Sequence, residues 1–431
     1  MEKQMSNLTR REFVKNATAL TAATATTLPA WAVREKREPI KIGFIGCGGR
    51  GTGAANQALT ANDSSVIWAM GDTFEDRLKG SMNTLVGEKG PRAEVPKERQ
   101  FVGFNAFQHV IDSGVDMVIL TTPPHFRPEH LAAAVKARKH VFCEKPLAVD
   151  GTGIRSVMDS ATLAKENDTN IVCGFMWRRN TALKALYEDL HDGLIGDVRS
   201  MYANYYTAPL WTKPRKDTWS DMEFQMRNWV HLDWLSGDHI VEQAVHSVDK
   251  INWLMQNESP VSATAIGGRE MHEGAVRGND YDHFAVVYEY ADGRRAHLHC
   301  RQMPFCYNDN NDYIVGSKDT CTVNAWNATP TFTGGTQWNF DGNVPNMYQV
   351  EHDELSAAIK GDRPTINDGA FMTKSTMMAI LGREAAYTGQ KVTFDEALAS
   401  TTRLGPTEYA FTSMEMPPVN LPGQTKLNRT S

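Results

Sequence analysis

The chain has 431 residues, with 45 basic and 51 acidic side chains and a formal net charge of −6. Residues 1–32 hold four basic and two acidic residues, so the rest of the chain carries −8. This balance argues against nucleic acid as a partner, and no basic block indicates a membrane surface. The roughly four hundred residues after the first thirty are enough for two domains with sizeable cores.

The first 32 residues match a twin-arginine export signal. Arg10 and Arg11 precede an Ala- and Thr-rich stretch, residues 17–28, and an Ala-x-Ala end at Ala32. The apolar stretch is too short to span a bilayer. The pattern predicts a protein that the twin-arginine machinery carries folded to the periplasm, with cleavage after Ala32 and no stable membrane insertion.

The six cysteines show neither a CxxC motif nor the spacing of a zinc site. Three of them lie in or beside apolar segments that read as buried strands. The pattern therefore predicts small core residues instead of disulfides or metal ligands. The six are Cys47, Cys143, Cys173, Cys300, Cys306 and Cys321.

A glycine motif follows the first apolar strand of the mature chain. Gly46-x-Gly48-x-x-Gly51 precedes an expected helix, and a second apolar run ends at Asp72. The glycines allow a tight turn and close approach to a pyrophosphate, and the helix N-terminus offers free N–H groups. Asp72 would accept hydrogen bonds from the ribose hydroxyls and repel a 2′-phosphate. Because Thr73-Phe74 supplies no arginine, the motif predicts NAD over NADP.

Residues 38–170 alternate strand and helix signals, which predicts a doubly wound parallel sheet of the Rossmann type. Strands are expected at 40–46, 66–71, 116–121 and 140–143, and helices at about 52–60, 74–84, 105–113, 128–138 and 151–167.

Residues 171–410 change in pattern and predict an α/β substrate-binding domain with a large, mostly antiparallel sheet. After a strand at 171–175, strand-like segments lie at 197–206, 261–267, 283–290 and 295–301. Residues 208–234 read as a long irregular segment over a polar ligand. Residues 350–388 read as helices that pack back on the first domain, and 411–431 as an extended tail.

A second constellation follows the strand at 140–143. It ends in Glu144-Lys145-Pro146, and the carboxyl ends of such strands face the ligand crevice. Further on, residues 237–253 read as one helix with Glu242 and His246 one turn apart on one face. A histidine beside an apolar helix face is also often a satisfied core residue.

The same helix has two acids and two histidines close in sequence, which could in principle bind a metal. No further ligand spacing supports it, so no metal is expected. The four side chains are Asp238, His239, Glu242 and His246.

The glycine motif, the Glu-Lys-Pro and the acid-x-x-x-His together resemble the Gfo/Idh/MocA family over roughly residues 38–410. The resemblance implies that Lys145 and His246 handle the proton of a substrate hydroxyl, with a cis bond before Pro146. Glu242 stands where the family usually has Asp, so its carboxylate is displaced by one methylene.

The resemblance and the motifs together give two sets of binding residues. The set expected for NAD is Gly46, Gly48, Gly49, Arg50, Gly51, Asp72, Thr121, Pro123, His125, Glu144, Lys145 and Arg178. The set expected for the sugar is Lys145, Trp211, Arg227, Asn228, Trp229, Gln243 and His246, because rings stack on sugar faces and Arg or Asn fix hydroxyls.

The resulting expectation is an exported, NAD-dependent oxidoreductase that oxidises a ring hydroxyl of a pyranoside, at C3, and recycles tightly bound NAD. Homo-oligomers are expected. One alternative is an NAD-dependent glycosidase that acts by transient C3 oxidation, elimination, hydration and re-reduction. The other is a non-catalytic, NAD-containing sugar-binding protein, which the presence of both Lys145 and His246 disfavours.

Overall fold

The parallel sheet of the N-terminal half has six strands in the order β3-β2-β1-β4-β5-β6 in a computed structural model that describes residues 39–428. Its strands are β1 (Lys41–Ile45), β2 (Val66–Asp72), β3 (Gln100–Val102), β4 (Met117–Leu120), β5 (His140–Cys143) and β6 (Ile171–Cys173). All pair in parallel. Strands β4 and β5 are almost fully buried because helices cover both faces, and they are apolar except for His140 at the start of β5. The predicted doubly wound fold is confirmed.

The helices of this half follow the predicted alternation and set the positions of the loops. They are α2 (Gly49–Ala61), α3 (Glu75–Lys89), α4 (Ala106–Asp112), α5 (Arg127–Lys136) and α6 (Gly151–Glu166). The three-residue edge strand β3 was not predicted, since its residues show no apolar alternation. Because every strand ends at the same edge, the loops after β1, β2, β4 and β5 meet there.

The second sheet has eight strands in the order β13-β12-β11-β7-β10-β9-β8-β14. They are β7 (Val198–Thr207), β8 (Ser262–Gly268), β9 (His283–Glu289), β10 (Arg295–Gln302), β11 (Asn311–Gly316), β12 (Thr320–Asn324), β13 (Thr331–Phe332) and β14 (Val392–Thr393). Only β7 and β10 pair in parallel, which confirms the mostly antiparallel prediction. Burial alternates along β9 and β10, so one face of the sheet is covered.

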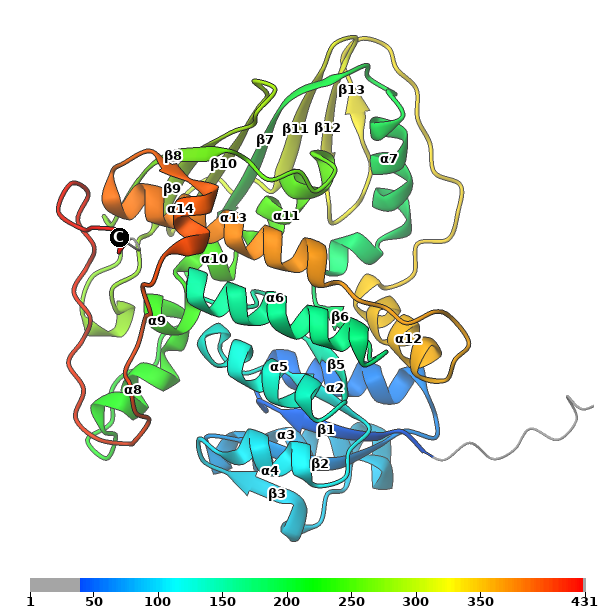
Figure 1. The fold of residues 1–431 in the computed structure, drawn as a ribbon, viewed down its shortest axis with the longest axis vertical. Helices are drawn as coiled ribbons and strands as arrows, with labels where there is room; N and C mark the ends of the chain where they lie inside the picture. Colours follow the sequence, from blue (N-terminus) through cyan, green and yellow to red (C-terminus); the bar gives the residue numbers. More distant parts are fainter. Residues whose placement is uncertain (1–38, 429–431) are drawn as a thin grey trace, which may run out of the picture. The chain divides into compact units, whose positions relative to one another are not determined.

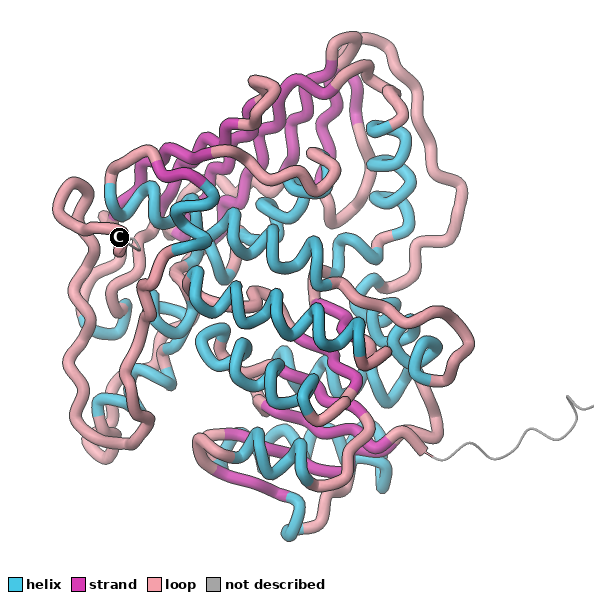
Figure 2. Tube along the Cα trace, viewed as in Figure 1, coloured by secondary structure: helices cyan, strands magenta, loops and turns pink. Residues whose placement is uncertain are grey.

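Helices join the two sheets (Figure 1). The helix α13 (Gly369–Thr388) packs against α6 on one side and against β8 and β9 on the other. The helix α12 (Met347–Ile359) packs against α2 and touches β5 and β6. The helix α14 (Phe394–Ala399) packs against α13 and β14, and α7 (Thr181–His191) packs against α11 (Val245–Leu254). In Figure 2 the strands of the second sheet lie side by side with helices along one side.

Two predicted segments differ from the structure. Residues 208–234 are not irregular throughout, because they contain α8 (Asp221–Arg227), whose first turn is capped by the side chain of Ser220, and the start of α9 (Asp233–Ser236). The single helix expected at 237–253 is two helices, α10 (His239–Glu242) and α11 (Val245–Leu254). The amides of Gln243 and Ala244 both donate to the carbonyl of His239, which breaks the helical register.

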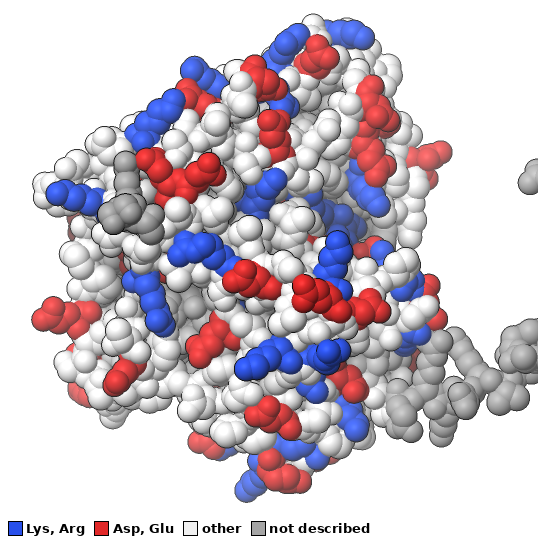
Figure 3. Space-filling model, viewed as in Figure 1, with Lys and Arg blue, Asp and Glu red and all other residues white. Residues whose placement is uncertain are grey.

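The tail runs along the outside of the second half without helix or strand over its described residues 411–428. It is held by side chains, since Asp221 accepts from Ser413 and Tyr281 donates to the carbonyl of Asn420 at 2.7 Å. Basic and acidic side chains are interspersed on the face in Figure 3. No helix among residues 39–428 is long and apolar enough to cross a membrane. The predicted export signal and the last three residues lie outside the described range.

Five of the six cysteines are buried, and all six are free thiols. Cys306 is the exception to the predicted core position, because it is exposed in the turn between β10 and β11. Burial raises the pKa of Cys143 to about 12, so that thiol stays protonated.

Candidate active site

The glycine motif forms a cradle between β1 and α2. Gly46 has φ +94°, and a Cβ there would lie 2.6 Å from the backbone of Thr121. A Cβ on Gly51 would lie 2.3 Å from the carbonyl of Gly46. These close approaches need glycine, while the first amides of α2 remain free to point at a ligand. The cradle therefore fits a pyrophosphate.

Asp72 ends β2 beside the cradle, as predicted. Its carboxylate accepts from the amides of Cys47 at 2.7 Å and Phe74 at 2.8 Å, which fixes its orientation. Burial raises the pKa of Asp72 above its ordinary value, and the two amides act in the opposite direction. Each oxygen keeps a lone pair for a ribose hydroxyl.

A pocket of about 410 Å³ runs from the cradle past Asp72. The second half closes it with Trp211, Lys213, Met226 and Trp229 from the segment before α9. The residues predicted to bind NAD that line this pocket are Gly46, Gly48, Gly49, Arg50, Gly51, Asp72, Thr121 and Pro123. Arg77, from the first turns of α3, also lines it and acts electrostatically on Asp72. Sequence reasoning missed Arg77 because it considered only the two residues after Asp72.

Lys145 lies just after β5, and its peptide bond to Pro146 is cis, as expected. Its Nζ donates to the backbone carbonyl of Glu242 and, at 3.2 Å, to the Glu242 carboxylate. Both side chains are largely buried, at 12% and 9% exposure. The longer acid at position 242 thus still reaches the lysine, and Glu242 also accepts from Gln243 at 2.6 Å. Residues nearly a hundred positions apart meet at the edge of the parallel sheet.

His246 lies in the first turn of α11, among aromatic rings. Its ring centroid is 5.1 Å from that of Trp177 and 6.1 Å from that of Phe175. Burial lowers the pKa of His246 well below its ordinary value, and the positive charges of Lys145 and Lys250 lower it further. The imidazole is therefore neutral near pH 7 and has a lone pair that can accept a proton.

Arg50 and Glu144, both expected at the cofactor, pair with each other at 2.5 Å. Glu144 is buried behind the cradle, and Arg50 also lies over the ring of Tyr348 at 5.0 Å. The pair joins the helix after the glycine motif to the turn before Lys145. Burial opposes the charge on Arg50, but Glu144 offsets this effect and raises the Arg50 pKa.

Four predicted binding residues have their polar groups engaged within the protein. Arg227 pairs with Asp76 and Glu223. Asn228 bonds the backbone of Lys213 on both its amide and its carbonyl. These contacts hold the segment that closes the nucleotide pocket, and they leave neither the guanidinium nor the amide free to bind a sugar.

The other two, Arg178 and His125, also make internal contacts, and a fifth predicted residue, Gln243, does so as well. Arg178 binds Asp249 with two nitrogens and lies over the ring of Phe371, and it does not line the pocket. His125 contacts the hydroxyl of Tyr409 at 2.7 Å, and burial lowers its pKa to about 4. Gln243 accepts from the hydroxyl of Tyr205 at 3.0 Å, next to Glu242.

Another groove lies away from this site. It has a volume of about 850 Å³ between α6 and α13, and its lining includes Met158, Ala161, Ala370 and Met377. It contains none of the predicted site residues. The four side chains weighed as metal ligands in the sequence do not form a metal-type group among residues 39–428 either.

The fold and the site together define a dinucleotide-dependent oxidoreductase. The parallel sheet carries a glycine cradle and an acid at the end of β2, and a buried lysine and a neutral histidine lie at the same edge. Comparison with known families agrees. The oxidoreductase family with an NAD-binding Rossmann fold, Gfo/Idh/MocA, matches residues 40–175, and the C-terminal domain of that family matches residues 183–322. The chain belongs to the Gfo/Idh/MocA family, and it is an NAD-binding oxidoreductase.

Similar proteins include a 2,7-anhydro-N-acetylneuraminate hydratase of Escherichia coli, 25% identical over 64% of this chain and 68% of that protein. A myo-inositol 2-dehydrogenase of Thermotoga maritima is 25% identical over 59% of this chain and 66% of that one. Each match thus spans about two thirds of the relative. The crystal structure of aldose-aldose oxidoreductase from Caulobacter crescentus, 19% identical, has a TM-score of 0.64 and covers 82% of this chain and 99% of its own, which supports the fold.

Proposed function

We propose that this chain is an exported sugar oxidoreductase that oxidises a ring hydroxyl, at C3, of a pyranoside or free sugar. The main support is the buried contact of Lys145 with Glu242. It lies beside a neutral His246, at the edge where β5 meets the nucleotide cradle. The relatives named as acting on inositol and aldoses support a polyhydroxylated ring as the substrate.

The residues divide the chemistry between them. Bound at the cradle, NAD would supply the hydride acceptor for the carbon that bears the hydroxyl. The neutral imidazole of His246 accepts the hydroxyl proton. Lys145 has three N–H groups, and Glu242 takes two of them, which leaves one for the substrate oxygen. Glu242 therefore positions Lys145 and does not itself need to touch the sugar.

Export and cofactor retention belong to the same proposal. Arg10 and Arg11 would send a folded, NAD-loaded protein across the membrane, where no free nicotinamide pool is expected. Closure of the cradle by Trp211 and Trp229 favours slow release of NAD. Changing both arginines to lysine should leave the protein in the cytoplasm with NAD bound. Activity that is lost on dialysis and restored only by added NAD would contradict internal recycling.

A second candidate is the hydrolytic route, in which transient oxidation at C3 leads to elimination, hydration and re-reduction. The observation in its favour is the relative named a hydratase, because that name denotes addition of water and not net oxidation. The same Lys145 and His246 would serve the oxidation and the re-reduction.

One experiment separates the two candidates. Purified protein is incubated with a panel of nitrophenyl glycosides while bound NADH absorbance, 3-keto product and released phenol are followed. Keto product without phenol supports the oxidoreductase, and phenol released without added NAD supports the hydrolytic route. A panel that gives neither product nor any change in bound NADH would contradict both.

A further inference from the structure

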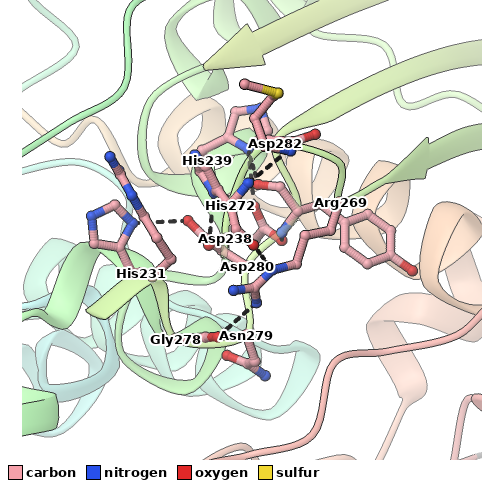
Figure 4. A network of polar contacts seen from close by, with 12 residues as sticks. His231, Asp238, His239, Arg269, His272, Gly278, Asn279, Asp280 and Asp282 are labelled. Carbon is pink, nitrogen blue, oxygen red and sulfur yellow. Dashed lines mark hydrogen bonds and ion pairs between the residues drawn. The ribbon is translucent and has the colours of Figure 1, made fainter. Parts of the chain in front are cut away.

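A cluster of two histidines and one aspartate lies behind the segment that covers the nucleotide pocket. His231 ends the short turn Trp229–His231, and His272 and Asp280 lie in the loop between β8 and β9 (Figure 4). The Nδ1 atoms of His231 and His272 lie 3.1 and 3.0 Å from the two oxygens of Asp280. All three side chains are at most 2% exposed. One ligand atom from each falls within 4.8 Å of the others.

The ring of His231 has an acceptor on both sides. Its Nε2 lies 3.0 Å from the carbonyl oxygen of Trp211, so that nitrogen carries the hydrogen. A neutral imidazole has only one N–H, which leaves the Nδ1 lone pair facing the Asp280 carboxylate. Two lone pairs that face each other in a buried site repel each other, and a cation between them removes the repulsion. A ligating histidine commonly donates its other N–H to a carbonyl in this way.

His272 contacts the other oxygen of the same carboxylate. Its Nδ1 faces Asp280, and its Nε2 is buried without a hydrogen-bond partner in the described structure. The ring therefore gains no polar contact inside the protein other than the one at the cluster. Two imidazoles and a carboxylate are a donor set that suits Zn²⁺, with metal–ligand bonds of about 2.0–2.2 Å and ligand atoms therefore about 3.3 Å apart.

The loop that presents these side chains is firmly supported. The carboxylate of Asp282 accepts from the amides of residues 270–272, and Arg269 donates to the carbonyls of His272 and Gly278 (Figure 4). Gly278 has φ +52°, and a Cβ there would lie 2.0 Å from the carbonyl oxygen of His231. The loop and the turn that ends at His231 are thus held in close contact without the cluster.

We propose that His231, His272 and Asp280 bind one divalent transition-metal ion of the Zn²⁺ type. Through the contact of His231 with Trp211, the ion anchors the segment that closes the nucleotide pocket. This anchoring role rests on NAD binding at the cradle, whereas the metal site itself does not depend on the proposed reaction. No local pattern predicts a metal here, because His231 lies 41 residues before His272 in the sequence.

The experiment is a metal titration of the mature, NAD-containing protein after dialysis against a chelator. We expect one equivalent of Zn²⁺ to bind, and Co²⁺ to give the visible absorption of a tetrahedral nitrogen–oxygen site. His272→Gln should weaken binding at least about tenfold. His283→Gln is the matched control, because His283 pairs with the neighbouring Asp282 at 2.7 Å and lies outside the cluster.

The wild-type titration alone keeps the test decisive if a variant fails to fold. If the chelator-treated wild-type protein binds neither Zn²⁺ nor Co²⁺, the site is overturned, and a proton on His231 then holds the ring against Asp280. The anchoring role has its own measurement, the release rate of bound NADH. Release should be faster from chelated than from Zn²⁺-loaded protein, and equal rates would overturn the anchoring role while the site stands.

Discussion

The nucleotide end of the site and the end that holds Lys145 and His246 are built in different ways. At the nucleotide end, binding relies on backbone groups and one carboxylate from residues 46–72, which lie close in sequence. At the other end, buried charged groups come from the turn after β5 and from α10 and α11, about a hundred residues apart. Local glycine chemistry makes the first end, whereas burial and long-range contacts lower the pKa of His246 at the second.

The largest expected effect separates the two ends directly. Lys145→Ala and His246→Ala should each reduce turnover at least about a hundredfold, the usual loss for a positioned acid–base group. Bound nucleotide, measured by mass spectrometry after denaturation, should stay near the wild-type level. Lys136→Ala, on the exposed side of α5, is the matched control. Near-normal turnover in either variant would remove that residue from the proton path.

His352 tests whether burial lowers the pKa of a histidine in this protein. Its ring packs on that of Phe142 in β5, at a centroid distance of 4.2 Å. Burial, with a smaller effect of Arg50, lowers the His352 pKa to about 3. Below pH 6.5 the unfolded chain binds a proton at this position and the folded protein does not, so wild-type stability falls.

His352→Leu removes this loss. Relative to wild type, the variant should gain about 2 kcal/mol of unfolding free energy between pH 7 and pH 5, at about 1.4 kcal/mol per pH unit. Denaturant unfolding at the two pH values measures it. A difference between the two proteins that does not change with pH would show that His352 titrates normally in the folded state.

The glycine cradle is tested by Gly51→Ala, which should lower bound NAD at least about tenfold because the new Cβ meets the Gly46 carbonyl at 2.3 Å. Gly80→Ala in α3 is the control, since a Cβ there meets nothing within 4 Å. Alanine is also the better helix residue. Equal nucleotide content in the two variants would contradict the cradle.

Cofactor choice gives a smaller effect. Purified protein should carry NAD(H) and not NADP(H), and Asp72→Asn should weaken NAD binding by about three- to tenfold, since hydrogen bonds to a charged acceptor contribute about 1 kcal/mol or more. Arg77→Ala should change NAD affinity little. Asp72→Asn could also gain affinity for NADP. If adding Arg77→Ala removes that gain, Arg77 is the residue that binds the 2′-phosphate.

The smallest effect is expected at Arg227, whose partners Asp76 and Glu223 are 64% and 19% exposed. Such pairs contribute about 0–1 kcal/mol. Arg227→Ala should therefore leave the KM for the sugar within about twofold of wild type and speed NADH release slightly. A large rise in KM without faster release would restore the sugar-binding role predicted from the sequence.

By itself, the sequence determined the parts of this protein that depend on neighbouring residues. The glycine spacing, Asp72 after an apolar strand and the turn that carries Lys145 predicted the parallel sheet and NAD, because local backbone geometry and strand polarity are written in consecutive residues. The strand-like segments at 283–290 and 295–301 likewise predicted a mostly antiparallel sheet.

The tertiary structure decided which side chains remain free and which are charged. Arg227, Asn228 and Arg178 looked like ligand donors, but partners distant in sequence occupy them. Arg77 entered the pocket only through the orientation of α3. The meeting of His231 with His272 and Asp280 depends on long-range packing, which no local pattern encodes.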